Sequence, residues 1–377
     1  GTTHQPQSIF GSVSADFENH SPGTNDDDAV NITIASDQVN VIKHLLPGRF
    51  LQILTTSAEF TLSGGTGTTP VTPTNVNVLR ETTFGTSQVR PLRAGNSTIL
   101  VQKGTEKVKE ITFDLDTDGL LGVDLTVLAD HITRGGLTDM IWQQEPELIL
   151  WFVSANGELI GLTYDRANGT VGWHGHVLGG GGVVESITAI PSGAEDQVYL
   201  SVNIADAFFV DSGLTYSGSA TTTITGLNHL EGETVQILAD GSAHADKTVS
   251  GGSITLDRSA TKVHIGLGFT SFVKTLRLEA GANDGTSQGK IKRIHGVTAR
   301  FLDTVGAELG PETTSLDRIP FRDSSMAMDT AVPMFTGDKE ISFPAGYDND
   351  AQVVIQQSQP LPMTVLAIMR RSNTFDA

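Results

Sequence analysis

Three aspartates at alternate positions give the sequence its clearest metal-ligand pattern. Asp114, Asp116 and Asp118, followed by Gly119, match the first six positions of a calcium-binding EF-hand loop. In such a loop alternate carboxylates converge on the ion and the glycine makes a sharp turn. The twelfth position should supply a bidentate glutamate but is Leu125. Because that ligand is missing and a strand is expected before the loop, the pattern favours an acidic turn over a calcium site.

Two histidines form the second pattern. His174 and His176 are two residues apart in an expected strand, so both imidazoles point to the same side of it. A zinc site needs a further ligand and an orienting shell, and the spacing of the sequence ties no other His or carboxylate to the pair. We therefore expect a surface or interface pair, and we assign no catalytic, cofactor-binding or metal-ligating residue.

Several motifs for other chemistry are missing from the sequence. The glycine runs 64–67 and 179–182 lack the ending of a phosphate-binding loop. The absence of cysteine excludes thiol nucleophiles and cysteine-ligated zinc. Two basic clusters have no aromatic stacking platform beside them, so a solvated strand face or a subunit contact is favoured over nucleic-acid binding. They are Lys103, Lys107 and Lys109, and Lys290, Lys292 and Arg293.

Short runs of alternating polar and β-branched or aromatic residues, broken by glycine-containing turns, predict an all-β protein. The clearest segment is 148–164, in which Asn156-Gly157 predicts a two-residue type I′ hairpin turn. Asn168-Gly169 predicts the next turn, so three strands follow one another as a meander. Trp151 and Trp173 are expected to be packing anchors of these strands. Such hairpins in series are typical of a propeller or a sandwich.

One short helix is expected in the middle of the chain. Leu125, Leu128 and Ile132 share a helical face, Asp124 can cap its start, and Gly135-Gly136 can end it. The segment 36–47 fits either a helical turn or a strand.

A change of composition near residues 203–216 predicts a small β domain inserted into a larger body. We expect an N-terminal body part at 1–205, an inserted β-sandwich or barrel domain at 206–285, and a C-terminal β segment at 286–377 that returns to the main body. A length of 377 residues suits several domains or one repeat-built body.

Composition limits the partners of the chain. The 24 Lys and Arg against 43 Asp and Glu give a net charge of −19, which disfavours tight binding of phosphate backbones. No apolar run reaches the 18 or more residues that a membrane-spanning helix needs. Because the chain starts at Gly1 without an initiator Met or a signal peptide, we expect further sequence upstream.

Several motifs in order resemble the tail tubular protein B, or nozzle, family of short-tailed bacteriophages. They include Gln143-Gln-Glu-Pro146 and Leu162-Thr-Tyr-Asp-Arg166. The others lie at 7–12, 17–19, 35–40, 47–49, 133–136, 296–306, 319–322, 335–339, 342–347 and 359–368. The resemblance covers nearly the whole chain, although each motif by itself is a strand or turn signature.

The resemblance implies a β-propeller-like body with extra β domains, assembled as a homo-hexameric ring below the tail adaptor protein. Tail fibres are a further candidate partner, and viral DNA would pass through the lumen as cargo. The chain would then be a structural virion protein and not an enzyme, located in the phage tail and assembled in the bacterial cytoplasm. High negative charge suits such a conduit because it repels phosphates.

Two other functions stay open. A host-recognition protein that binds or cleaves cell-surface polysaccharide would need a carboxylate pair in an aromatic-lined cleft, and aromatic residues are only 6% of the chain. A calcium-stabilised adhesin would depend on the three aspartates alone.

Overall fold

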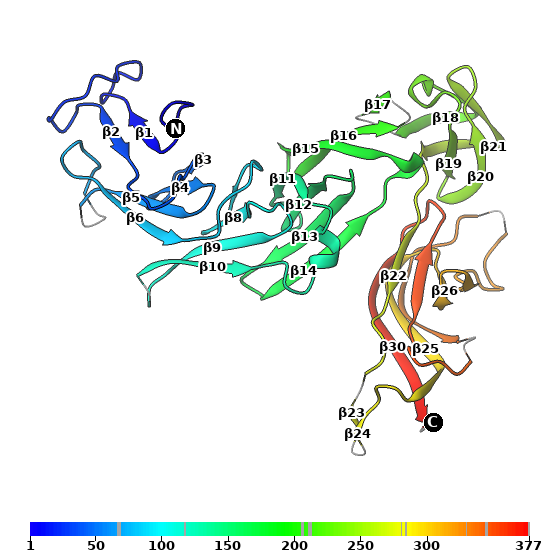
Figure 1. The fold of residues 1–377 in the computed structure, drawn as a ribbon. Coiled ribbons are helices and arrows are strands. Elements are labelled where there is room, and N and C mark those ends of the chain that lie inside the picture. The colour runs from blue at the N-terminus through cyan, green and yellow to red at the C-terminus, as the bar shows by residue number, and fades with distance from the viewer. Residues whose placement is uncertain are drawn as a thin grey trace. The chain divides into compact units, whose positions relative to one another are not determined.

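The computed structural model describes residues 1–65, 69–116, 118–204, 207–209, 213–279, 281–282, 285–328, 330–343 and 346–375. Nearly all regular structure in these ranges is β (Figure 1), which confirms the all-β prediction. The chain divides into two compact units: unit 1 holds residues 1–176 and 183–210, and unit 2 holds 177–182 and 211–377. The domain boundaries expected at 205/206 and 285/286 stay predictions.

Unit 1 contains three consecutive antiparallel sheets whose four strands follow one another in chain order. The first blade sheet comprises β3 (Ile42–Leu46), β4 (Leu51–Thr55), β5 (Glu59–Ser63) and β6 (Asn77–Thr82). The second comprises β7 (Leu92–Ala94), β8 (Ser97–Val101), β9 (Val108–Asp114) and β10 (Gly119–Asp124). The third comprises β11 (Leu137–Gln143), β12 (Ile149–Ser154), β13 (Leu159–Asp165) and β14 (Thr170–His176).

The second blade sheet is covered on both faces. Every residue of β8 is buried, and alternate side chains of a strand point to opposite faces. Ile99 and Val101 join a core cluster with Leu162 of the third sheet, while Leu100 packs with Leu54 of the first sheet. Four-stranded meanders packed face to face in series are the blade units of a propeller. The predicted propeller-like body is therefore confirmed.

Two smaller sheets complete unit 1. The first pairs β1 (Ser8–Gly11) with β2 (Val30–Thr33), and the second consists of β15 (Val183–Ser192), β16 (Glu195–Ile204) and β17 (Ala207–Phe209).

The predicted meander and its turn at Asn168-Gly169 are confirmed, but the turn at Asn156-Gly157 differs from the prediction. In the hairpin at Asn156-Gly157, the cross-strand hydrogen bond nearest the turn runs from the Ser154 N–H to the Glu158 carbonyl at 3.0 Å. Gly157 has φ +78°. Asn156 is not among the residues of positive φ, so a three-residue loop with a left-handed glycine replaces the expected type I′ turn. A type I′ geometry does occur at Asp240 and Gly241, with φ +46° and +77°.

The expected central helix is much shorter than predicted. It is α1 (Asp130–Thr133), and Ala129 precedes it without a side-chain cap. Asp124 ends β10 instead, and its Oδ1 accepts hydrogen bonds from the N–H and hydroxyl of Thr126 at 2.9 and 2.5 Å. Leu128 is 93% exposed, so it does not share a buried helical face. Gly136, with φ +80°, follows the helix as expected.

Unit 2 begins with a small sheet that has its own core of twelve buried residues, including Val235 and Val263. This sheet corresponds to the small β domain of the predicted fold. Its strands, in spatial order, are β18 (Gly213–Thr225), β21 (Ser253–Gly266), β19 (Thr234–Ala239) and β20 (Ser242–Thr248).

Two further sheets of unit 2 share a core cluster that includes Phe301 and Leu309. One has the order β22 (Ser271–Lys274), β29 (Val354–Gln357), β26 (Glu308–Glu312), β27 (Ser315–Arg318). The other has the order β28 (Phe335–Ser342), β25 (Ile291–Thr304), β30 (Thr364–Phe375). A short hairpin joins β23 (Gly281–Ala282) and β24 (Gly285–Thr286).

Candidate functional site

The EF-hand-like segment forms a β-hairpin connection. Asp114 is the last residue of β9 and pairs with Gly119, the first residue of β10. Asp118 has φ +48° and makes the tight turn between them, while Thr117 lies outside the described residues. Leu125, at the position of the missing glutamate, packs against the core of the second and third blade sheets. The preference for an acidic turn over an EF-hand is therefore confirmed.

Both basic clusters include a buried lysine, which the prediction of solvated strand faces missed. Lys109 is 9% exposed, and its Nζ lies 2.9 Å from Asp124 Oδ2. Burial by itself raises the pKa of Asp124, but hydrogen bonds from Lys109 and Thr126 outweigh it and lower the pKa to about 2. Lys292 is 1% exposed and donates to the Asn349 carbonyl at 2.7 Å. These lysines stabilise local structure.

The predicted histidine pair lies beside Trp151 on one face of the third blade sheet. His174 Nδ1 and His176 Nε2 are 2.6 Å apart. The Trp151 ring centroid is 6.0 Å from that of His174 and 4.8 Å from that of His176. Trp151 is thus outside the buried core cluster, although it was predicted to be a packing anchor. Trp173 does pack against that cluster, and its ring centroid lies 5.3 Å from that of Phe152. We call Trp151, His174 and His176 the ring cluster.

Neighbouring residues hold the ring cluster in place. Trp151, Gly161 and His174 are directly opposite one another on three adjacent strands. A Cβ at Gly161 would lie 2.1 Å from His174 Cε1, so this glycine makes room for the imidazole. Thr163 Oγ1 lies 3.2 Å from His174 Nε2, and the Trp151 indole donates to Gln143 Oε1 at 2.8 Å. Burial lowers the pKa of both histidines, so the imidazoles are neutral at pH 7.

A second constellation joins the third blade sheet to the second. The Arg166 guanidinium pairs with Glu110 of β9, a residue that is 2% exposed. Ser97 donates to the same carboxylate oxygen at 2.9 Å, and the Tyr164 hydroxyl donates to Ser97 at 3.3 Å. Tyr164 and Arg166 both come from the motif Leu162–Arg166. This motif therefore lies at a joint between two sheets.

The motif Gln143–Pro146 forms a comparable joint with the hairpin of β15 and β16. Asp196 Oδ2 accepts hydrogen bonds from the N–H groups of Gln144 and Glu145 at 2.8 and 3.3 Å. The Asp196 N–H donates to the Glu145 carbonyl at 2.9 Å, and Gln143 Nε2 donates to the Asp196 carbonyl at 3.2 Å. The hairpin tip is thus fixed to the end of β11.

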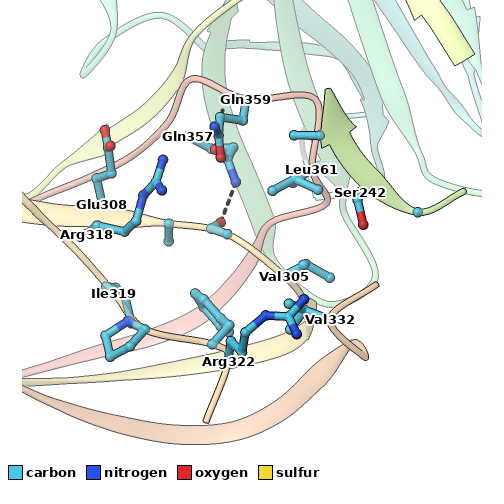
Figure 2. Close-up of a pocket in the computed structure, with 16 residues that line it drawn as sticks. Ser242, Val305, Glu308, Arg318, Ile319, Arg322, Val332, Gln357, Gln359 and Leu361 are labelled. Atoms are coloured by element: carbon cyan, nitrogen blue, oxygen red, sulfur yellow. Dashed lines mark hydrogen bonds between the residues drawn. The ribbon is translucent and has the colours of Figure 1, made fainter. Parts of the chain in front are cut away.

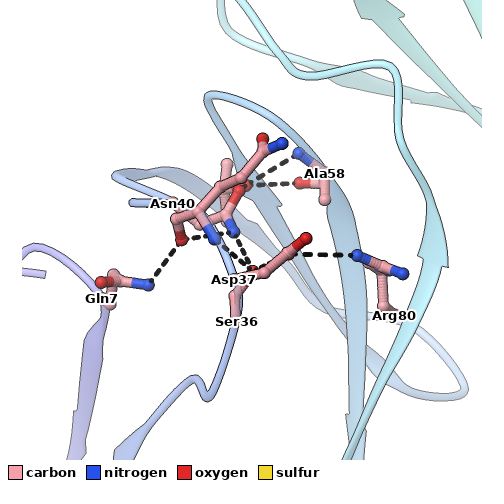
Figure 3. Close-up of polar contacts among 8 residues, drawn as sticks. Gln7, Ser36, Asp37, Asn40, Ala58 and Arg80 are labelled. Carbon is pink, nitrogen blue, oxygen red and sulfur yellow. Dashed lines mark hydrogen bonds and ion pairs between the residues drawn. The ribbon is translucent and has the colours of Figure 1, made fainter.

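The segment 36–47, left open between helix and strand, contains a hydrogen-bonded loop followed by β3. Figure 3 shows Asn40 at the centre of the loop. Asn40 is 1% exposed; its Nδ2 donates to Ser36 Oγ at 2.7 Å and to the Gln38 carbonyl at 3.2 Å. Its Oδ1 accepts from the Thr55 hydroxyl at 3.0 Å. Asp37 at the loop tip pairs with Arg80 at 3.5 Å.

Glu59 is a fully buried carboxylate that the sequence analysis missed. It accepts hydrogen bonds from the hydroxyl of Thr82 at 2.5 Å, the N–H of Phe84 at 3.2 Å and the hydroxyl of Thr86 at 3.2 Å. These donors belong to the segment that leads from the first blade sheet to the second. Burial raises the pKa of Glu59 above its usual value of 4.5, although these hydrogen bonds oppose the shift.

The raised pKa of Glu59 predicts a pH effect. Between pH 4.5 and the folded-state pKa the folded chain binds more protons than the unfolded chain, so this group lowers stability as pH rises through that window. We expect the free energy of unfolding of Glu59→Gln, relative to that of the original chain, to increase across the same window. Urea unfolding at a series of pH values measures this difference. If the difference in free energy of unfolding between the two proteins did not change with pH, Glu59 would not have a raised pKa in the folded chain.

A cavity of about 320 Å³ lies in unit 2 between the start of β20 and the sheet of β26 and β29 (Figure 2). Val305, Ile319 and Leu361 supply much of its apolar lining. Glu308 is the one carboxylate among the described residues that line it. The Arg322 guanidinium donates to the carbonyls of Ala327 and Thr330. A carboxylate pair suited to glycosidic cleavage is therefore not part of this lining.

Within the described ranges, no helix is long and apolar enough to cross a membrane. No group of three or more His, Cys, Asp or Glu side chains could hold a metal ion among the same residues. Two motifs that stood out in the sequence, Gln143–Pro146 and Leu162–Arg166, lie at joints between sheets.

No protein-family model matches the sequence, and no curated protein matches it either. A similar solved structure is the exo-beta-1,3-galactanase of Phanerochaete chrysosporium with beta-1,3-galactotriose. The match covers 92% of this chain and 87% of that chain, at 8% sequence identity and a TM-score of 0.25.

This neighbour is an enzyme, and it contradicts the expectation that the chain is not one. That expectation, which came from the resemblance and from the lack of an assigned catalytic residue, is withdrawn. A TM-score of 0.25 gives no argument for galactan as a substrate of this chain.

Proposed function

We propose that the chain is a subunit of a phage tail nozzle, a homo-hexameric ring that conducts the genome out of the particle. The observation that carries the proposal is the position of the motifs that resemble the nozzle family. Arg166, Gln143 and Asn40 belong to three of these motifs and make hydrogen bonds or ion pairs that fix sheets or loops of unit 1. A subunit of a closed ring needs a rigid body, because small errors between sheets add up around the ring.

Surface features support contact between subunits. Leu121 and Val123 are 49% and 40% exposed on one face of the edge strand β10, and Leu128 just after it is 93% exposed. Large apolar side chains grouped along an edge strand favour association with another chain. We assign this edge to a neighbouring copy in the ring.

The other partners follow from the same proposal. The tail adaptor would lie above the ring, tail fibres are a further candidate partner, and viral DNA would pass as cargo. A net charge of −19 for each subunit supports passage without adhesion. The ring would belong to the virion and be assembled in the bacterial cytoplasm.

Sedimentation of the purified chain tests the assembly. We expect a species of six times the 39.9 kDa mass of the chain. Leu121→Asp combined with Leu128→Asp should reduce that species at least about tenfold, because charge at an apolar contact is costly. Thermal stability should change little, since both side chains are exposed. A monomer in the original chain, with or without the adaptor, would count against the proposal, and a stable hexamer of the double variant would remove β10 from the contact.

Polysaccharide binding is a second candidate function, and Trp151 is the observation that favours it. Its indole is partly exposed and is held by Gln143, and a fixed aromatic ring with polar neighbours is a common element of small-ligand sites. Trp151→Ala should then weaken binding to host polysaccharide, measured on immobilised glycan. If the original chain and Trp151→Ala bound the glycan equally well, or if neither bound it, this role of Trp151 would be rejected.

A further inference from the structure

We propose that His174 and His176 bind one divalent transition-metal ion as a two-imidazole chelate on the surface of the third blade sheet. The donor atoms are His174 Nδ1 and His176 Nε2, which face each other at 2.6 Å. Two residues of spacing on β14 place both rings on the same side of the strand. The inference is independent of the proposed ring function.

The donor atoms have the chemistry that a metal ion needs. Imidazole nitrogen suits zinc, copper and nickel ions, and it binds them in the neutral form. A metal–nitrogen distance of about 2.0–2.1 Å would require the two nitrogens to move to roughly 3 Å apart, a small rotation of the exposed His176 ring.

The surroundings of the pair resemble those of a built site. The second nitrogen of His174 contacts Thr163 Oγ1, which orients the ring as a metal site requires. Gly161 leaves the space that the ring occupies, and Trp151 packs against both imidazoles. No third His, Cys, Asp or Glu in the described part of the chain completes the set. Water molecules would therefore fill the remaining coordination positions.

Titration of the full chain with Ni²⁺ tests the proposal, followed both by calorimetry and by tryptophan fluorescence. We expect one equivalent of Ni²⁺ to bind and to quench Trp151, whose ring centre is 4.8 Å from that of His176. His176→Ala and His174→Ala should each weaken binding about 10- to 100-fold. Gly161→Ala should also weaken it, because the added Cβ displaces the His174 ring. Trp151→Phe should keep the binding heat and lose the quenching.

His264→Ala is the matched control, because His264 is an exposed strand histidine that also contacts a threonine hydroxyl, Thr215, at 3.0 Å. It should bind Ni²⁺ like the original chain. His4→Ala controls for binding near the N-terminus. The proposal would be overturned if the original chain bound no Ni²⁺ up to about millimolar concentration. It would also be overturned if His176→Ala and His174→Ala both kept the original affinity, or if His264→Ala or His4→Ala lost as much affinity as they do.

Discussion

Arg166→Ala is expected to lower the free energy of unfolding of unit 1 by about 2 to 4 kcal/mol, because it leaves the buried carboxylate of Glu110 without its cation. Glu110 has 3% of its side chain exposed, and among the described residues Ser97 still donates a hydrogen bond to its carboxylate when Arg166 is removed. An unpaired buried charge costs far more than a lost surface contact. Urea unfolding followed by tryptophan fluorescence measures the effect on unit 1, because Trp142, Trp151 and Trp173 all belong to it.

Arg80→Ala is the matched control for this experiment. Arg80 also pairs with a carboxylate in unit 1, that of Asp37, but the two side chains are 53% and 73% exposed. Exposed ion pairs contribute about 0 to 1 kcal/mol. Equal losses in the two variants would show that burial of Glu110 does not set the strength of the joint.

Asn40→Ala is expected to cost about 2 to 3 kcal/mol in the same assay. The side chain of Asn40 satisfies Ser36 Oγ, the Gln38 carbonyl and the Thr55 hydroxyl. The Thr55 hydroxyl keeps its bond to the Ala58 carbonyl at 2.6 Å, so the expected loss is that of three hydrogen bonds of a buried amide, each contributing about 0.5 to 1.5 kcal/mol. Some of that cost is recovered where water reaches the loop.

Asn168→Ala provides the comparison for Asn40. Asn168 also hydrogen-bonds through its side chain, to Asp165 at 2.6 Å, but on the exposed turn between β13 and β14. We expect it to cost less than about 1 kcal/mol, because water can replace the lost bond. If Asn40→Ala lost no more free energy of unfolding than Asn168→Ala, the buried hydrogen bonds of Asn40 would not stabilise the loop as proposed.

Local signals of the sequence predicted much of the fold. Glycine in turn positions located the hairpins at Gly157 and Gly169, because those positions require positive φ. The number of residues in a loop was harder to predict. Asn156 takes an ordinary φ, since the strand register places Ser154 opposite Glu158, and this register is set by packing of the whole sheet.

Tertiary contacts explain the helix that was predicted too long. Asp124 was expected to cap a helix, but the strand pairing of β10 continues through Asp124 to Lys109. Its carboxylate then pairs with Lys109 and accepts a hydrogen bond from the N–H of Thr126. Helix propensity over one short stretch is small compared with such pairing.

Several contacts of the candidate residues are made with partners that are far away in the sequence. Arg166 and Glu110 are 56 residues apart, and Gln143 and Asp196 are 53 apart. Sequence spacing cannot pair such residues, so Glu110 and Glu59 went unnoticed. His174 and His176 were predicted correctly as a pair on one strand face, because their relation depends on strand geometry alone.

Negative-stain electron microscopy of the purified chain, alone and with the tail adaptor protein, tests the proposed ring most directly. We expect sixfold rings with a central opening in at least one of the two samples. Arg166→Ala, which weakens a joint within the subunit, should yield fewer and less regular rings than Arg80→Ala. Single subunits in both samples, or closed particles without an opening, would contradict the conduit function.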